Sequence, residues 1–267
     1  MTAYAEVIGD PIAHSLSPSI HGFWLKVLKI DAEYRRTLMT RADFPAFLAK
    51  RRSDSKWRGC NVTMPLKLDA VALADDATDR AVAAGAANLL LPRDGRLIAG
   101  NTDVAGVRAL FERLTALPKS VTLLGNGGAA RAILVALHDL GVHKMRIQSR
   151  DHAAAVALAV EFGLSEAPRA LTAPVDTAAL INATPIGMAG TEHVTLDIAG
   201  MPADGLVFDL VTAPAETPLL RAARARGLAT FDGLDMLVEQ DADSFALLFD
   251  KQPPRDQDAA LFKELRG

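Results

Sequence analysis

Residues 120–130 read SVTLLGNGGAA, and they carry the strongest local signal of the chain's architecture. Its first five residues form an apolar run, so we expect a buried strand that leads directly into a glycine loop with the pattern G-x-G-x-x-A. A helical pattern follows as far as Leu140. Gly125 permits the tight turn, Gly127 lets a pyrophosphate approach the backbone, and Ala130 lets the helix pack closely on the strand. This context predicts a dinucleotide site at the helix N-terminus, and the alternative is an ordinary glycine-rich turn.

The end of the next expected strand, residues 144–149, discriminates between the two nicotinamide dinucleotides. Arg150 can accept a 2′-phosphate, which favours NADP. Asp151 could hold a ribose 2′-hydroxyl, which favours NAD unless this residue only caps the following helix. The sequence therefore favours NADP and leaves NAD possible.

Short apolar runs alternate with helical patterns along the whole chain, which is typical of α/β proteins with largely parallel sheets. We expect two domains, with boundaries after residues 103 and 235 and with the last helices returning to the first domain. Asp94-Gly95 predicts a hairpin turn. Strands are expected at residues 4–8, 33–39, 58–62, 89–91, 97–98, 120–124, 144–149, 179–182, 206–210 and 228–231. Helices are expected at residues 17–28, 43–52, from 64, 103–114, 128–140, 151–162, 217–226 and 233–249, with a short one after Pro253-Pro254.

Composition excludes several classes of protein. Half of the 267 residues are hydrophobic and 23% are charged, which is typical of a globular domain. The net charge of -3 gives no electrostatic support for a nucleic-acid or membrane partner. No signal peptide or membrane span is expected, and one cysteine, Cys60, cannot form an internal disulfide, so we expect a cytoplasmic protein with Cys60 buried. The six histidines lack metal-ligand spacing, and no metal is expected.

Three polar segments carry more functional groups than turns need: residues 9–18, 61–67 and 100–103. Each follows an expected strand and leads into an expected helix, which places them at carboxyl ends of strands, where open α/β sheets bind ligands. Together they offer hydroxyls, amides, one ammonium and one carboxylate, a suitable lining for a small polyhydroxylated acid. Singly, each has a structural reading: Ser17, Thr63 and Asp103 can cap helices, and Lys67 can be a solvated side chain.

These segments resemble those of the shikimate dehydrogenase family, which reduces 3-dehydroshikimate with NADPH. The similarity runs in the family's order from Gly9 to about Phe249. The matching stretches are GDPIAHSLSPSIH, NVTMPLK, GAANLLLPRDGRLIAGNTDVAG, LLGNGGAARA, INATPIGM, APAETPLL and GLDMLVEQ.

The resemblance implies a reversible NADP-dependent reduction of 3-dehydroshikimate to shikimate, a step toward chorismate and the aromatic amino acids. It implies an N-terminal α/β substrate domain, residues 1–103 with 236–267, and a Rossmann-type NADP-binding domain, residues 104–235. It makes Lys67 and Asp103 the catalytic pair, in which lysine relays the proton and aspartate orients it. The implied substrate-binding residues are Ser15, Ser17, Asn61, Thr63, Asn88 and Gln240. The implied cofactor-binding residues are Gly125, Asn126, Gly127, Gly128, Ala129, Ser149, Arg150, Thr184, Met188 and Gly233.

The chain departs from the family's pattern at several positions. Gly22 stands in place of an asparagine, Leu89 in place of a threonine, and Thr212 in place of a tyrosine that helps to hold the substrate. A second basic residue is missing after Arg150, and Asp241 replaces a small residue.

Two other functions therefore remain open. One is a quinate or aminoshikimate type of dehydrogenase, which uses NAD as its cofactor or acts on a related cyclic hydroxy acid. The other is a catalytically silent dinucleotide-binding regulatory protein, against which the retention of Lys67 and Asp103 argues. The expected partner is a small-molecule substrate, and the expected state is a monomer or homodimer.

Overall fold

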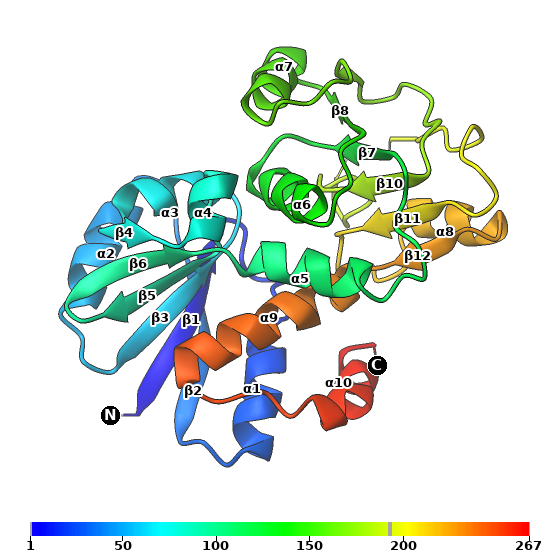
Figure 1. Cartoon of the computed structure of the whole chain (residues 1–267). Helices are drawn as coiled ribbons and strands as arrows, with labels where there is room; N and C mark the ends of the chain where they lie inside the picture. The colour runs from blue at the N-terminus through cyan, green and yellow to red at the C-terminus, as the bar shows by residue number, and fades with distance from the viewer. Residues whose placement is uncertain (1, 192–193, 267) are drawn as a thin grey trace. The chain divides into compact units, whose positions relative to one another are not determined.

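The structure is a computed structural model that describes residues 2–191 and 194–266. The chain forms two compact units, Met1–Ala105 with Val238–Gly267, and Gly106–Leu237. Each unit contains a six-stranded sheet with helices (Figure 1). The expected α/β class is confirmed, and so is the return of the C-terminal helices to the first unit.

The sheet of the first unit has the strand order β2-β1-β3-β5-β6-β4. Its strands are β1 (Ala3–Gly9), β2 (Ala32–Leu38), β3 (Trp57–Val62), β4 (Asp76–Ala77), β5 (Leu89–Arg93) and β6 (Arg96–Gly100). Strands β1, β2 and β3 are parallel, whereas β5 runs antiparallel to both β3 and β6. Strand β6 therefore runs in the direction of β1 and β3, and the ends of these three strands lie at one edge of the sheet. The three polar segments follow those ends.

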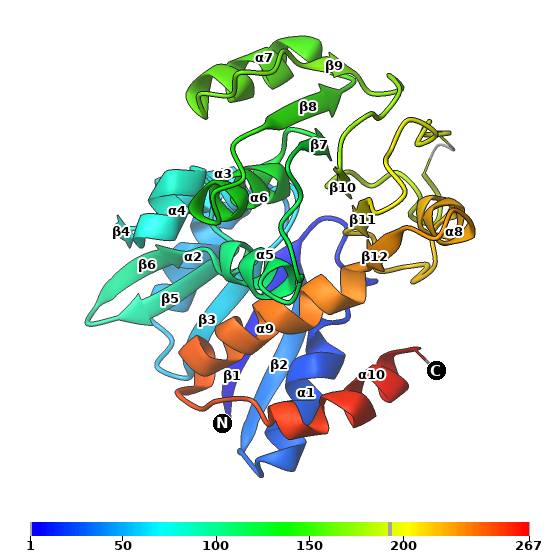
Figure 2. The ribbon, with the colours of Figure 1, turned by 45° about the vertical axis from the view of Figure 1, so that its right-hand side comes forward.

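Helices cover both faces of this sheet. The helices of the unit include α1 (Ser17–Val27), α2 (Phe44–Arg52), α3 (Lys67–Leu73), α4 (Asp79–Ala84) and α10 (Asp258–Arg266), while α5 (Thr102–Phe111) and α9 (Gly233–Phe249) contain the unit boundaries. Apolar residues of α2, α3 and α4 form one core with Tyr4, Ile8 and the buried Cys60. Tyr34 pairs with Ala5, the neighbour of Tyr4, so it points to the opposite face, where α1 and α9 pack (Figure 2).

The hairpin predicted at Asp94-Gly95 joins β5 and β6 in register, with positive φ at both turn residues. Three short elements were not predicted: β4, α4 and β9 (Arg169–Ala170). Two-residue strands are too short to show a periodicity. Helix α4 does carry sequence signals, because Thr78 caps its start and Gly85 ends it in the left-handed conformation.

The second unit contains a fully parallel sheet with the order β12-β11-β10-β7-β8-β9. Its strands are β7 (Val121–Leu124), β8 (Met145–Ser149), β9, β10 (Ala179–Asn182), β11 (Leu206–Asp209) and β12 (Ala229–Phe231). Its helices include α6 (Gly128–Asp139), α7 (His152–Glu161) and α8 (Pro218–Ala225). Counted along the unit, the order is 3-2-1-4-5-6, which is that of the Rossmann fold. The strand order reverses between β7 and β10, and ligands of such sheets bind at that point.

Apolar side chains of α8, including Leu220 and Ala223, pack with Leu180 and Val207 on one face of this sheet. Within the described parts of the chain, no helix is long and apolar enough to cross a membrane.

Candidate active site

Lys67 and Asp103 come together at the edge of the first sheet. Lys67 begins α3 after β3, and Asp103 lies in the first turn of α5 after β6. The ammonium nitrogen of Lys67 donates to Oδ2 of Asp103 over 2.5 Å. Their side chains are 15% and 8% exposed, respectively, so the pair is largely shielded and still reachable from solvent. The sequence also allows Asp103 to cap its helix, but both of its carboxylate oxygens accept hydrogen bonds from side chains, those of Lys67 and Asn88.

Asn88 lies just before β5 and links this pair to α9. Its side-chain nitrogen lies 2.9 Å from Oδ1 of Asp103 and 2.9 Å from Oε1 of Gln240. Its oxygen accepts the backbone N–H of Thr102 over 2.7 Å. Because this N–H donates to it, the Asn88 oxygen is fixed, and its NH₂ group faces these two acceptors and the Thr102 hydroxyl, 2.8 Å away.

Gln240 lies on α9 and is bound at both ends of its amide. Its oxygen accepts from Asn88, and its nitrogen donates to Oδ1 of Asp241 over 2.7 Å. The structure therefore brings four predicted site residues, namely Lys67, Asp103, Asn88 and Gln240, into one hydrogen-bonded chain.

A second branch contains Asn61, at the end of β3. Its oxygen accepts from the hydroxyl of Tyr34 over 2.7 Å, and its nitrogen donates to the hydroxyl of Ser244 over 2.7 Å. Burial raises the pKa of Tyr34 well above its usual value, and the charge of Asp241 raises it further, so this hydroxyl stays protonated. Ser244 and the hydroxyl of Thr102 lie 3.0 Å apart, which joins the two branches.

The other predicted substrate residues lie at the same edge but outside this network. Ser15, Ser17 and Thr63 make no side-chain hydrogen bond to it within the described residues. The proposed capping role is wrong for Ser17 and for Thr63, because α1 and α3 have Leu16 and Leu66 at their N-caps and no side-chain cap. Ser17 is already inside the helix, with Pro18 next to it.

The glycine loop connects β7 to α6 as the sequence predicts. Gly125 has a φ of +101°, and a Cβ there would lie 2.9 Å from Cγ2 of Thr184 and 3.1 Å from the carbonyl oxygen of Ala183. Thr184 follows β10, so these two segments flank the point where the strand order reverses. By contrast, a Cβ on Gly127 would meet nothing within 4 Å. No side chain of the described residues caps α6, so its first N–H groups have no side-chain acceptor. Asn126, Gly128 and Ala129, around this start, are half-buried.

The predicted 2′-phosphate segment follows β8. Ser149 is buried, and its hydroxyl accepts the backbone N–H of Asp151 over 3.2 Å. Arg150 is exposed. Asp151 caps α7, with Oδ1 accepting the N–H of Ala154 over 2.9 Å. The capping role that the sequence left open for Asp151 is therefore present.

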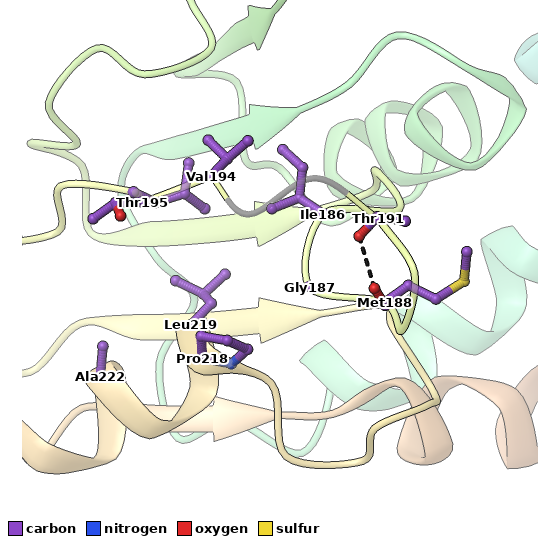
Figure 3. A pocket seen from close by; sticks show the side chains of 10 residues that line it. Ile186, Gly187, Met188, Thr191, Val194, Thr195, Pro218, Leu219 and Ala222 are labelled. Carbon is purple, nitrogen blue, oxygen red and sulfur yellow. Dashed lines mark hydrogen bonds between the residues drawn. The ribbon is translucent and has the colours of Figure 1, made fainter.

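The remaining predicted cofactor residues lie elsewhere in the second unit. Gly233 begins α9 against the backbone carbonyls of Leu210 and Val211. Met188 lies in the loop after β10 and lines a pocket of about 320 Å³ (Figure 3). This pocket is mainly apolar, with Ile186, Gly187, Met188, Thr191, Val194, Thr195, Leu196, Pro218, Leu219 and Ala222 around it. Of the predicted site residues, Met188 alone lines it, so this pocket is a feature separate from the glycine loop.

Sequence reasoning missed three members of the network in the first unit, namely Tyr34, His21 and Ser244. Tyr34 is the one buried residue in the middle of β2, among charged neighbours, and an isolated aromatic in a polar strand is a usable signal. His21 and Ser244 have no such signal, because each lies with other polar and apolar residues on the buried side of its helix. No group of three or more potential metal ligands occurs in the part of the chain that the structure describes.

Comparison with known proteins identifies the family. A model of the shikimate dehydrogenase substrate binding domain matches residues 7–90. A shikimate dehydrogenase (NADP(+)) of Sphingopyxis alaskensis is 45% identical over 260 residues, which cover 97% of this chain and 95% of that protein.

Solved structures agree with this result. Shikimate 5-dehydrogenase from Thermus thermophilus, in complex with NADP(H) and shikimate, is 33% identical with a TM-score of 0.87, covering 98% of this chain and 99% of that one. Quinate dehydrogenase from Corynebacterium glutamicum, in complex with NAD, is 29% identical with a TM-score of 0.85 and the same coverage. The chain belongs to the shikimate dehydrogenase family.

Proposed function

We propose that this protein is an NADP-dependent oxidoreductase that reduces 3-dehydroshikimate reversibly to shikimate. The observation that carries the proposal is the Lys67–Asp103 pair, which presents an ammonium group at the ligand-binding edge of the first sheet. Among the relatives reported above, the Sphingopyxis protein bears the name of this activity, and the Thermus structure contains both NADP(H) and shikimate. A binding protein without turnover would not need such a pair.

The chemistry follows from the donors of Lys67. One of its three N–H groups is held by Asp103, which fixes the ammonium and leaves two N–H groups for the substrate. Bound NADPH supplies the hydride that reduces the ketone carbon. Lys67 polarises the ketone oxygen by a hydrogen bond and delivers the proton that completes the new hydroxyl. In the oxidation direction, Lys67 accepts that proton from the hydroxyl.

The second unit has residues that fit the cofactor. The open space at Gly127 and the uncapped start of α6 suit a pyrophosphate, because free N–H groups and the helix dipole both favour negative charge. Arg150 is exposed and suits the 2′-phosphate of NADP. The use of Asp151 as a helix cap weakens the reading in which it holds a ribose hydroxyl, and this supports NADP over NAD.

Two departures from the family's pattern favour a second candidate, a quinate type of dehydrogenase that uses NAD. Thr212 stands where the family has a tyrosine that helps to hold the substrate, and Arg150 lacks a second basic residue beside it. The quinate dehydrogenase reported above shares the fold over nearly the whole chain. The Lys67–Asp103 chemistry is the same for both substrates, because each presents a secondary hydroxyl for oxidation.

The test is cofactor reduction by absorbance, with shikimate and quinate each paired with NADP and NAD. Robust turnover of shikimate with NADP is the expected result. Turnover confined to quinate or NAD would replace the proposal with the second candidate. Cofactor binding without turnover in any pairing would favour a regulatory protein. Light scattering on the same preparation measures the molar mass in solution and so distinguishes a monomer from a homodimer.

A further inference from the structure

A buried acid–base pair lies behind the network of the first unit. The Nε2 atom of His21, on α1, lies 3.4 Å from Oδ1 of Asp241, on α9, and both side chains are 0% exposed. The His21 ring stacks on Tyr34 with centroids 3.9 Å apart, and Phe245 lies 5.6 Å away on another side. A carboxylate is costly to bury without a partner, so a residue of this kind needs a specific reason for its position.

Asp241 has one neighbour in the candidate active site. Its Oδ1 accepts from the amide nitrogen of Gln240 over 2.7 Å. In this bond the carboxylate oxygen is the acceptor, so the NH₂ end of Gln240 faces it. The oxygen of Gln240 then has to face Asn88, whose NH₂ group also binds Asp103. The carboxylate of Asp241 and the amide of Asn88 therefore favour the same orientation of the Gln240 amide.

We propose that Asp241 is a positioning residue that fixes the orientation of the Gln240 amide through its acceptor oxygen, with His21 as its buried partner. The proposal rests on the function proposed above only in that the oriented Gln240 serves a shikimate-like substrate. A reversed Gln240 amide would place a second NH₂ group against the NH₂ of Asn88. It would also place the oxygen of Gln240 against the carboxylate oxygen of Asp241, so that an acceptor would face an acceptor and a donor would face a donor. The NH₂ group of Asn88 would keep Asp103 and the Thr102 hydroxyl, 2.8 Å away, as acceptors.

His21 places Nε2 within ion-pair distance of this carboxylate. Neither ring nitrogen of His21 has a hydrogen-bond partner among the described residues, and neither does Oδ2 of Asp241, so the bond from Gln240 is the hydrogen bond that the carboxylate accepts there. Trp24 and Phe245 lie edge-on to each other beside it, which keeps the pair in dry surroundings. A small residue at position 241 would need no such partner.

The decisive variants differ in whether they keep an acceptor at position 241. Asp241→Leu removes the acceptor and introduces a larger apolar side chain, while Asp241→Asn keeps the volume and an oxygen that can face Gln240. We expect Asp241→Leu to raise the KM for shikimate by roughly tenfold or more, since an unpaired buried donor remains. Asp241→Asn is expected to restore the KM to within about threefold of the wild type. The KM for NADP is expected to change by less than about twofold in both.

Leu248→Ala is the matched control, because Leu248 is fully buried on the same helix and its apolar side chain takes no part in hydrogen bonding. It is expected to lower the thermal midpoint without changing the KM for shikimate. A wild-type KM in Asp241→Leu, or an Asp241→Asn variant as impaired as Asp241→Leu, would overturn the proposal. If Asp241→Leu does not fold, Asp241→Ala takes its place, and the measurement below uses the wild type directly.

A measurement without substrate separates this proposal from the proposed function. In ¹⁵N-labelled protein, the side-chain NH₂ signals of Gln240 are assigned by their loss in Gln240→Glu. Slow hydrogen exchange of these protons in the wild type, lost in Asp241→Leu and kept in Leu248→Ala, supports the positioning role even if shikimate is not the substrate. Fast exchange in the wild type would refute it. A wild type that does not turn over shikimate, with slow exchange intact, would refute the proposed function alone.

Discussion

The side-chain nitrogen of Asn88 lies 2.9 Å from Oδ1 of Asp103, the same carboxylate whose Oδ2 holds Lys67. The asparagine thus occupies one side of Asp103 and the lysine the other. This contact gives Asn88 a task besides the substrate binding that the family resemblance implies: it fixes the rotation of the carboxylate. A rotated carboxylate would present its oxygens differently to Lys67, so the position of the ammonium group depends on Asn88.

Asn88→Asp tests this relationship. The substitution replaces the donating NH₂ group by a carboxylate oxygen that faces Asp103, and buried like charges at this distance repel strongly. We expect kcat/KM for shikimate to fall by about a hundredfold or more. The steady-state rate with varied shikimate measures this loss.

Asn101→Asp is its control, because Asn101 is also buried but donates to the backbone carbonyl of Ala86. That variant is expected to lower the thermal midpoint and to leave kcat/KM within about tenfold of the wild type. Equal losses of kcat/KM in both variants would show that any new buried carboxylate in this region lowers activity, whether or not it faces Asp103.

Lys67→Ala tests the proton relay itself. Because a positioned acid–base group contributes about 10²- to 10⁴-fold, we expect kcat to fall by that factor. The affinity for NADP, measured by fluorescence titration, should stay within about twofold, since Lys67 lies in the other unit from the glycine loop. Lys50→Ala, an exposed lysine on α2, serves as the control with unchanged kcat. Wild-type turnover in Lys67→Ala would remove this residue from the mechanism.

Arg150→Ala tests cofactor choice. A guanidinium that binds a 2′-phosphate contributes to NADP affinity and contributes nothing comparable to NAD affinity. We expect the KM for NADP to rise by roughly tenfold or more, with the KM for NAD changed by less than about twofold. The control is Arg221→Ala, an exposed arginine of α8. An equal rise for both cofactors would contradict the 2′-phosphate role.

The Arg146 cluster predicts a pH dependence of stability in the second unit. Hydrogen bonds from this guanidinium hold the pKa of Glu166 and the pKa of Asp176 below their usual values. Since the folded pKa values are lowered, the stabilisation is present above the unfolded values near about 4 and is lost as the pH falls through the folded ones.

Arg146→Met removes this stabilisation. We expect a lower thermal midpoint than in the wild type at pH 7. The difference in thermal midpoint between variant and wild type should be smaller at about pH 3, and circular dichroism measures both. Arg221→Met, which removes an exposed arginine, should leave the midpoint within about a degree at either pH. A constant difference between the two pH values would show that Arg146 acts through packing of its stem.

Much of the fold could be predicted because its signals are local. The apolar run before Gly125, the Asp94-Gly95 turn and the regular alternation of strands and helices each depend on neighbouring residues. Helix caps were less predictable. Helix α1 begins one residue earlier than expected, so Leu16 occupies the N-cap position predicted for Ser17, while Asp151 caps α7 as the sequence allowed. Such shifts are small in energy, so packing decides them.

By itself, the sequence determined the two α/β units, the glycine loop at the start of α6, and the polar segments at the ends of parallel strands, because backbone periodicity and turn chemistry act over a few residues. Which polar groups meet depends on contacts between distant parts of the chain. Asn88 and Gln240 are 152 positions apart, and His21 and Asp241 lie on helices from opposite ends of the chain. Hydrogen bonds depend on distance and direction in space, and no local pattern encodes either for such pairs. Packing of α1 and α9 on the sheet brings these groups together, and hydrogen bonds with the Thr102 backbone N–H and with Asp241 orient the amides of Asn88 and Gln240.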